Sequence, residues 1–402
     1  MGIRQKIVSL TLAGFYSPDY FKKNNLKDRI EKLTGIKKAK KADAFLITSA
    51  ASLKYLSGYF FYFEHGLSPF QLLPAALVVG QEQNSILVLA DNETQQSTFI
   101  DPSVSIKTYE SYVYEKPIDH TDQFLFQLNQ AFDQVGIKNI RLGVELNMLP
   151  ASLVLFLTSR YPGIELVDIT AEITNLRIIK DEDEIESIRQ AANLSDIGQA
   201  AVLRLAKTGM SELELFNLVR REMEEHVGTR VPLMADFVSG AATATGGGLP
   251  TNKIINQGDL ILTDFTPCLN GYWGDSCSTI VMGPPTIEQS KIFNLVREAL
   301  EIGINTIRAG VQAKEVDFAM RQHLKAEGNF GHHGGHGVGV VYHEEPRITP
   351  YNTILLQPGM VIALEPAVYK NDYGIRLEHL VTVTNDGCKL LTKFTHCFEQ
   401  GN

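Results

Sequence analysis

Two histidines stand in a glycine-rich stretch near the C-terminus, GGHGVGVVYHEEP at residues 334–346. His336 has a glycine on each side, and His343 follows seven residues later. Glycine lets a backbone pass close to a site and adopt conformations that other residues avoid. An imidazole on such a backbone is suited to binding a metal ion or to transferring a proton.

Four carboxylates lie in apolar, strand-like runs that form two similar hairpins. Asp264 in DLILTDF and Asp275 in GYWGDSCSTIV belong to the first hairpin. Glu365 in MVIALEP and Glu378 in IRLEHLVTV belong to the second. Because an unpaired charge in an apolar strand is costly, we expect these acids to share partners.

The spacing within the first hairpin allows two registers. Asp264 and Asp275 are eleven residues apart. A turn centred on Leu269–Asn270 would place them directly opposite each other, whereas a tight turn at Asn270–Gly271, which its chemistry favours, would make them diagonal neighbours. Their odd separation keeps them on one face of the hairpin in either register.

The second hairpin has a simpler register. Glu365 and Glu378 are thirteen residues apart around YKNDYG. A turn at Asn371–Asp372 sets the two glutamates opposite each other, with Cβ atoms about 5 Å apart. Each hairpin is therefore expected to present a pair of carboxylates on an apolar surface.

The two hairpins belong to an internal repeat with an offset of 101 residues. Aligning Gly209 with Gly310 matches TGMSELELFNLVRREMEEHVG to AGVQAKEVDFAMRQHLKAEGN and carries Asp264 onto Glu365. Each copy is typical of two helices, an irregular stretch and a strand-rich run. Two copies are too few for a solenoid, so we predict one pseudo-symmetric domain.

Pseudo-symmetry would bring the two carboxylate pairs together. Four buried carboxylates cannot all stay ionised without cations between them. Hard oxygen ligands and the imidazole of His336 suit two divalent ions of the manganese, zinc or cobalt kind. His343 would then be available as an acid or hydrogen-bond donor. Alternatives for GHGVG are a flexible turn or a phosphate cradle, but a cradle requires a helix directly afterwards, and VVYHEEP does not begin one.

The rest of the chain supplies the elements that position these residues. Residues 42–170 alternate strand-like runs such as AFLIT (44–48) with helical runs such as TDQFLFQLNQAFDQVG (121–136), which indicates an α/β domain. The acidic start of KDEDEIESIRQAANLSD (180–196) predicts a long helix. We place the domain boundary near residues 170–180. The predicted parts are an extension at 1–25 with an accessory helix, an N-terminal domain at 26–172 and a catalytic domain at 173–402.

Composition bounds the class of protein. A chain of 402 residues with 44% hydrophobic and 21% charged residues is typical of two globular domains. Its net charge of −9 argues against a nucleic-acid partner. We expect no signal peptide, because Ser9 and Thr11 interrupt the short apolar run near the N-terminus, and no apolar stretch reaches the roughly 20 residues that span a bilayer. The four cysteines, at 268, 277, 388 and 397, form no CxxC motif, so we expect reduced thiols in a cytoplasmic protein rather than a zinc site.

Together these motifs resemble the creatinase/aminopeptidase family, peptidase family M24, over nearly the whole chain. ADAFLITSAASLKYLSGYFF (42–61) is similar to the opening of the family's N-terminal domain, and LRIIKDEDEIESIRQAA (176–192) to its linker and first catalytic-domain helix. Within the family, the likeness is greatest to Xaa-Pro aminopeptidases and prolidases. The resemblance implies an α/β N-terminal domain and an α+β pita-bread C-terminal domain with a pseudo-two-fold internal repeat.

The resemblance also implies residue roles. The five positions that match the family's metal ligands are Asp264, Asp275, His336, Glu365 and Glu378. Asp275 and Glu378 would bridge two divalent ions, manganese ahead of zinc or cobalt. Asp264 would chelate one ion, and His336 and Glu365 would hold the other. The catalytic positions are His343 and Glu365, and the substrate-binding positions are His332, Tyr369 and Arg376.

Three departures from the family pattern concern the surroundings of the ligands. The family's peptidases carry a histidine ahead of the first ligand strand, but none occurs here between His226 and His323. Phe265 and Thr266 stand where the family has x-Gly after its first aspartate, and a histidine follows Glu378. The missing histidine bears on substrate choice, and the GGG segment at 246–248 could widen the pocket or supply N–H donors.

The implied activity is metal-dependent hydrolysis of the amide bond after the N-terminal residue of a peptide, with proline in second position. In this scheme two ions lower the pKa of a shared water, Glu365 accepts its proton and His343 stabilises the oxyanion. One alternative is a creatinase-like hydrolase or lyase for a small non-peptide substrate, and another is a non-catalytic interaction module. The expected partners are a peptide and a second copy of the chain, without nucleic acid or membrane.

Overall fold

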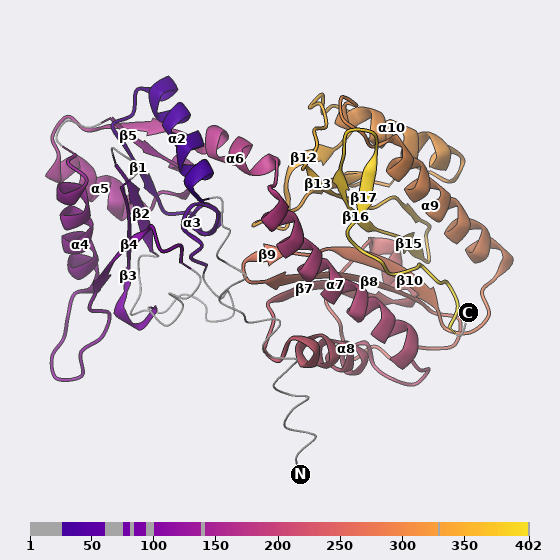
Figure 1. Ribbon diagram of the computed structural model, residues 1–402. Helices are drawn as coiled ribbons and strands as arrows, with labels where there is room; N and C mark the ends of the chain where they lie inside the picture. The colour runs from indigo at the N-terminus through magenta and orange to yellow at the C-terminus, as the bar shows by residue number, and fades with distance from the viewer. Residues whose placement is uncertain are drawn as a thin grey trace, which may run out of the picture. The chain divides into compact units, whose positions relative to one another are not determined.

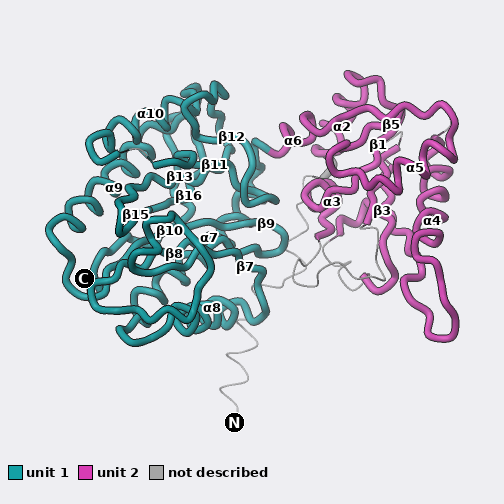
Figure 2. The backbone as a smooth tube through the Cα atoms, turned by 180° about the vertical axis from the view of Figure 1, so that it is seen from behind, with its two compact units in different colours: residues 1–15, 178–402 teal, residues 16–177 magenta. Residues whose placement is uncertain are grey.

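The computed structural model describes residues 26–60, 75–80, 84–93, 100–137, 141–328 and 330–400. Figure 1 shows the elements along the chain, and Figure 2 colours its two compact units, which meet in the sequence between Arg177 and Ile178. Each unit has its own apolar core. The helix predicted within residues 1–25 lies outside the described residues.

The unit that Figure 2 labels unit 2 is built on one six-stranded sheet in the order β4-β3-β2-β1-β5-β6. Its strands are β1 (Ala44–Ile47), β2 (Ala76–Val79), β3 (Ser85–Ala90), β4 (Ser105–Tyr109), β5 (Arg141–Val144) and β6 (Glu165–Asp168). Every residue of the three strands β1 to β3 is buried, which explains their continuous apolar runs.

Helices cover both faces of this sheet. They are α2 (Leu26–Lys40), α3 (Ala50–Ser57), α4 (His120–Gln134) and α5 (Ala151–Arg160). A short 3₁₀ helix, η5 (Leu146–Met148), precedes α5, and α6 (Thr170–Ile178) follows the last strand. Leu46 and Val88 pack with Phe124 of α4 and Leu157 of α5 in one core. Helices α2 and α3 lie on the other face (Figure 1). The predicted α/β domain is confirmed.

The unit that Figure 2 labels unit 1 contains two copies of a helix–helix–strand arrangement. The first copy comprises α7 (Glu182–Leu205), α8 (Glu212–Val227), β7 (Leu233–Ser239), η6 (Gly240–Thr245), β8 (Leu260–Leu269), β9 (Tyr272–Trp273) and β10 (Ser276–Val281). The second comprises α9 (Ile287–Thr306), α10 (Ala313–Leu324), η7 (Lys325–Glu327), β11 (Gly335–Gly337), β12 (Glu344–Ile348), β13 (Val361–Leu364), β14 (Ala367–Tyr369), β15 (Gly374–Arg376), β16 (His379–Val383) and β17 (Cys388–Leu390).

Hydrogen bonds repeat with the offset seen in the sequence. Isolated bridges join Ser211 to Ile254 and Gln312 to Leu355, and both partners of the second bridge lie 101 residues after those of the first. The N–H of Gly209 donates to the carbonyl of residue 255, and that of residue 310 donates to residue 356, each at 2.9 Å. The predicted pseudo-symmetric domain is therefore confirmed.

Each copy packs its helices on its own sheet. Helices α7 and α8 cover a sheet with the order β10-β8-β7, and α9 and α10 cover one with the order β12-β11-β13-β16-β17 (Figure 1). The predicted acidic start of α7 forms a capping box, in which Asp181 accepts from the N–H of Glu184 at 2.9 Å.

Two further expectations concern the whole described chain. No helix within the described residues is long and apolar enough to cross a membrane. All four cysteines are present as thiols, as predicted.

Candidate active site

The first hairpin takes the second of its two possible registers. Leu269 pairs with Tyr272, which leaves Asn270 and Gly271 as a two-residue turn with positive φ of 53° and 82°. This turn suits the right-handed twist of paired strands. Because Cys277 rather than Asp275 stands opposite Asp264, the two aspartates are diagonal neighbours.

The second hairpin has the predicted register. Leu364 pairs with His379, and Ala367 pairs with Arg376. Glu365 and Glu378 therefore stand opposite each other, as their spacing predicts. Both glutamates are buried, with 7% and 1% of their surface exposed.

The glycine-rich segment brings His336 to these hairpins on strand β11, between β12 and β13. A Cβ on Gly335 would lie 2.1 Å from the carbonyl oxygen of Ala363, and one on Gly337 would lie 2.3 Å from that of Glu345. The predicted close backbone approach is confirmed. The prediction that these glycines adopt backbone conformations that other residues avoid is wrong, because none of the glycines at 334, 335, 337 and 339 has a positive φ.

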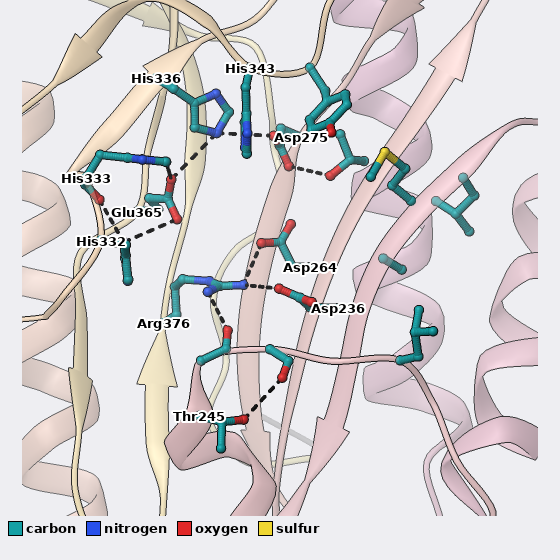
Figure 3. Close-up of a pocket in the computed structure, with 18 of the residues that line it drawn as sticks. Asp236, Thr245, Asp264, Asp275, His332, His333, His336, His343, Glu365 and Arg376 are labelled. Atoms are coloured by element: carbon teal, nitrogen blue, oxygen red, sulfur yellow. Dashed lines mark hydrogen bonds and ion pairs between the residues drawn. The ribbon is translucent and has the colours of Figure 1, made fainter. Parts of the chain in front are cut away.

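Asp264, Asp275, His336 and Glu365 line a pocket of about 1080 Å³, shown in Figure 3. Its polar lining consists of Asp236, Thr245, Asp264, Thr266, Asp275, His332, His333, His336, Tyr342, His343, Glu365, Tyr369 and Arg376. Its apolar lining includes Phe216, Leu233, Met234, Ala235, Leu249 and Pro250. A polar floor beside an apolar wall is the usual character of a small-ligand site.

His336 faces the acids through one nitrogen. Its Nδ1 lies 3.1 Å from the carbonyl oxygen of Gly337, and its Nε2 lies 3.6 Å from Oδ2 of Asp275 and 3.6 Å from Oε1 of Glu365. Asp275, His336 and Glu378 each offer one ligand atom, and these atoms lie within 4.8 Å of one another. The fold thus brings together predicted ligands from both hairpins and from the glycine-rich segment.

The pKa values of the buried acids differ from their ordinary values. Burial, followed by repulsion from the neighbouring carboxylates, raises the pKa of Asp275 and of Glu378 well above its ordinary value. Burial alone would also raise the pKa of Glu365, but the hydrogen bond from His333 and the nearby His336 and Arg376 lower it to about 2.

Two buried carboxylate oxygens have no hydrogen-bond donor within the described part of the chain and could bind a cation. Oδ1 of Asp264 and Oε2 of Glu378 are buried and have no hydrogen-bond partner among the described residues. Orphaned, desolvated carboxylate oxygens beside an imidazole are what divalent cations of the predicted kind require. The residues present therefore fit a metal centre.

The three predicted substrate-binding residues form one chain of contacts at the pocket. Arg376 donates from Nη2 to Oδ2 of Asp264 at 2.7 Å, and from Nη1 to the hydroxyl of Tyr369 at 3.2 Å. That hydroxyl lies 3.0 Å from Nε2 of His332. The contacts hold Arg376 against the first hairpin (Figure 3).

The predicted catalytic His343 lies at the rim of the same cluster. Its ring centroid is 4.2 Å from that of His336, and its side chain is exposed to the pocket. The following residue, Glu344, forms a buried ion pair with Lys180. This pair anchors the backbone that carries His343.

Sequence reasoning missed two residues of the site, His333 and Asp236. Nε2 of His333 lies 2.9 Å from Oε1 of Glu365. Asp236 stands opposite Asp264 in the β7–β8 pairing and accepts from Nη2 of Arg376 at 3.0 Å. The available signals were a histidine directly before the glycine-rich stretch and one acid in the strand LMADFVS.

The GGG segment contacts Asp236 and Arg376. The N–H of Gly248 donates to Oδ1 of Asp236 at 2.8 Å, and the carbonyl of Gly246 accepts from Nη1 of Arg376 at 2.6 Å. A Cβ on Gly247 would lie only 2.2 Å from Oδ2 of Asp236. The glycines therefore allow the loop to close over this carboxylate.

An α/β unit followed by a two-copy helix–helix–strand unit, with acids and histidines from both copies around one pocket, defines the pita-bread class of metallopeptidases. Residues 186–385 match the family model for metallopeptidase family M24, and residues 29–179 match that for the creatinase/prolidase N-terminal domain. The chain belongs to metallopeptidase family M24, which confirms the predicted family, fold class and peptidase class.

Comparisons with known proteins agree with this assignment. A Xaa-Pro dipeptidase of Pyrococcus horikoshii is 32% identical over 262 residues, which are 64% of this chain and 74% of that protein. An uncharacterized peptidase of Bacillus subtilis, YqhT, is 27% identical over 90% of this chain and 97% of its own length. The crystal structure of an X-Pro aminopeptidase from Thermotoga maritima superposes with a TM-score of 0.77 at 26% identity, covering 92% of this chain and 99% of that one.

Proposed function

We propose that this protein is a Xaa-Pro aminopeptidase or dipeptidase that hydrolyses the amide bond after the N-terminal residue of a peptide, with two divalent cations as cofactors. One observation carries the proposal. The carboxylate pairs of two hairpins and the imidazole of His336 converge beside a pocket, and two of their buried carboxylate oxygens lack partners among the described residues. The likeness to a Xaa-Pro dipeptidase and an X-Pro aminopeptidase supports the substrate class.

The residues that would hold the cations are Asp264, Asp275, His336, Glu365 and Glu378. When bound, two such ions would supply a water molecule of lowered pKa and would polarise the scissile carbonyl. We take manganese as the expected ion because most of these ligands are carboxylates.

The chain's own residues would perform the proton transfer and the positioning. Glu365 has a lowered pKa and is ionised at neutral pH. We assign it the role of proton acceptor from the family resemblance. His343, exposed at the rim of the cluster, would donate a hydrogen bond to the oxyanion. His332 and Tyr369 would contact the substrate beside them.

The preference for proline fits the character of the pocket. A proline in second position removes the N–H at the scissile bond, so the enzyme needs no acceptor for it. The apolar lining near Met234 and Leu249 offers a surface for a ring instead.

Steady-state assays after manganese loading test the proposal with three peptides, namely Ala-Pro, Ala-Pro-Ala and Ala-Ala. We expect hydrolysis of at least one proline peptide and much slower cleavage of Ala-Ala. Preference for Ala-Pro would identify a dipeptidase, and preference for Ala-Pro-Ala an aminopeptidase. Equal kcat/KM for Ala-Ala and both proline peptides would refute the proline preference.

A creatinase-like hydrolase or lyase remains the second candidate function. It is favoured by one observation: the pocket lining contributed by residues 237–252 consists of Thr245, Gly246, Gly247, Leu249 and Pro250, without a histidine. Turnover of creatine by metal-free protein, with no turnover of the three peptides, would select this alternative.

Assembly and location are also proposals. We propose a homodimer in the cytoplasm, on the basis of the family resemblance and the reduced cysteines. Light scattering at several protein concentrations measures the oligomeric state. A constant monomer mass would contradict it.

A further inference from the structure

Three histidines converge at the edge of the pocket, beside the carboxylates. His333, His336 and His343 each offer one ring nitrogen, and these nitrogens lie within 4.8 Å of one another. The ring centroids are 5.2 Å apart for His333 and His336, 5.6 Å for His333 and His343, and 4.2 Å for His336 and His343. All three imidazoles come from one segment, residues 333–343, which folds around β11.

The donor set of this triad differs from that of the acids. Three imidazoles with an open fourth position are a familiar arrangement for zinc. Imidazole suits zinc, copper, iron and nickel, whereas carboxylate-rich sites suit manganese. The two groups of ligands in this pocket should therefore prefer different cations.

His336 belongs to both groups. Its Nδ1 lies against the carbonyl oxygen of Gly337, so Nε2 is the nitrogen that faces the other ligands. A ring nitrogen has one lone pair and can bind one ion at a time. The triad with His333 and His343 and the group with Asp275 and Glu378 must therefore compete for this nitrogen.

We propose that His333, His336 and His343 form an imidazole site for a borderline divalent cation of the zinc class, which competes with the carboxylate centre for His336. A cation at this site binds Nε2 of His336, so that His336 no longer contributes to the carboxylate centre, and it also binds His343. If the proposed hydrolysis is correct, zinc added beyond the amount that fills the carboxylate centre therefore inhibits it, and added manganese weakens zinc binding.

The experiment uses the full chain, stripped of metal with a chelator. Zinc affinity is measured by isothermal titration calorimetry for the wild type, His333→Ser and a matched control, His323→Ser. His323 lies on α10, where it contacts Glu298, so the control loses one imidazole away from the pocket. Circular dichroism verifies the fold of each variant.

The expected result is a loss of zinc affinity of at least about tenfold in His333→Ser, since even an outer-shell partner of a metal ligand is worth that much. His323→Ser should bind zinc like the wild type. Equal affinities in the two variants would overturn the inference.

Copper(II) provides a readout of the donor atoms themselves. In Glu378→Gln, which weakens the carboxylate group, electron paramagnetic resonance should show three nitrogen ligands on copper. Adding His333→Ser should reduce this number to two. Three nitrogens without His333 would overturn the inference.

These measurements need no substrate, so they separate the two proposals. If the peptides are not hydrolysed but His333→Ser loses zinc and a copper-bound nitrogen, the proposed function fails and the imidazole site stands. If the peptides are hydrolysed and zinc inhibits the wild type and His333→Ser equally, the proposed function stands and the imidazole site fails.

Discussion

Nη2 of Arg376 donates to Oδ2 of Asp264 at 2.7 Å, which places a fixed positive charge against a predicted metal ligand. The same nitrogen reaches Oδ2 of Asp236 at 3.0 Å. Because Asp236 and Asp264 stand directly opposite each other on neighbouring strands, they would repel without this guanidinium. Arg376 therefore joins the two strands through their acids.

Replacing Arg376 tests this relationship. In metal-free protein, Arg376→Met should lower the free energy of unfolding by about 3 kcal/mol, because it leaves two carboxylates without their shared cation. Manganese should restore part of the loss by neutralising Asp264. Urea unfolding with and without manganese measures both effects.

Arg347 on β12 provides the matched control, because its side chain is exposed. Arg347→Met should change the free energy of unfolding by no more than about 0.5 kcal/mol. Equal losses in the two variants would show that the ion pairs of Arg376 contribute nothing specific.

Removing Glu378 should affect stability and metal binding in opposite directions. Its pKa is raised well above normal by burial and by repulsion from Asp275 and Asp264. Glu378→Gln removes this repulsion, so metal-free protein should unfold at a higher urea concentration, while metal content and peptide hydrolysis should be lost. Metal per chain by mass spectrometry and Ala-Pro turnover check the second half.

Asp372→Asn is the control for this variant, since Asp372 lies exposed at the tip of the same hairpin. It should keep its metal and its activity. Asp275→Ala should behave like Glu378→Gln in metal content and turnover. Full turnover by either variant would contradict the proposed metal centre.

The stability of the protein should depend on pH through a buried histidine outside the pocket. Burial, with the neighbouring His379 next, lowers the pKa of His396 well below its ordinary value. The unfolded chain gains a proton on this imidazole as the pH falls below about 6.5, whereas the folded chain does not. The folded state therefore loses relative stability as the pH falls, by up to about 1.4 kcal/mol per pH unit.

His396→Gln should abolish that contribution. The difference in free energy of unfolding between wild type and variant, measured in urea without metal, should shift in favour of the variant from pH 7.5 to 5.5. Taking the difference cancels the contribution of the acids, which is common to both proteins. Exposed His226, changed to Gln, is the control. Parallel pH curves for wild type and His396→Gln would contradict the prediction.

The close approach at Gly337 predicts a steric effect. An added Cβ would lie 2.3 Å from the carbonyl oxygen of Glu345 and 2.6 Å from its carbon, both of which are backbone atoms. Gly337→Ala should cost about 1–3 kcal/mol of stability and displace His336, so metal affinity should fall as well. Urea unfolding and a manganese titration measure the two effects.

Gly387→Ala is the matched control, because nothing lies within 4 Å of its added Cβ. It should leave stability and manganese affinity close to those of the wild type. A Gly337→Ala variant as stable as Gly387→Ala would show that β11 can move away from residue 345 at no cost.

Local patterns in the sequence determined much of the fold and of the site. The thirteen-residue spacing of Glu365 and Glu378 predicted their pairing, because side chains alternate along strands and the turn fixes the register. The offset of 101 residues predicted two equivalent halves. Both inferences depend only on residues near each other in the chain, or on the likeness of two segments.

Only the tertiary structure decided which other residues lie beside the predicted acids at the site. Asp236 reaches Arg376 because β7 pairs with β8 and residue 376 comes from the other half of the repeat, 140 residues away. His333 acts beside Glu365 rather than in solvent because the chain folds β11 against β13. Such contacts arise from the packing of distant segments and from the directions of individual side chains, and neither leaves a periodic pattern in the sequence.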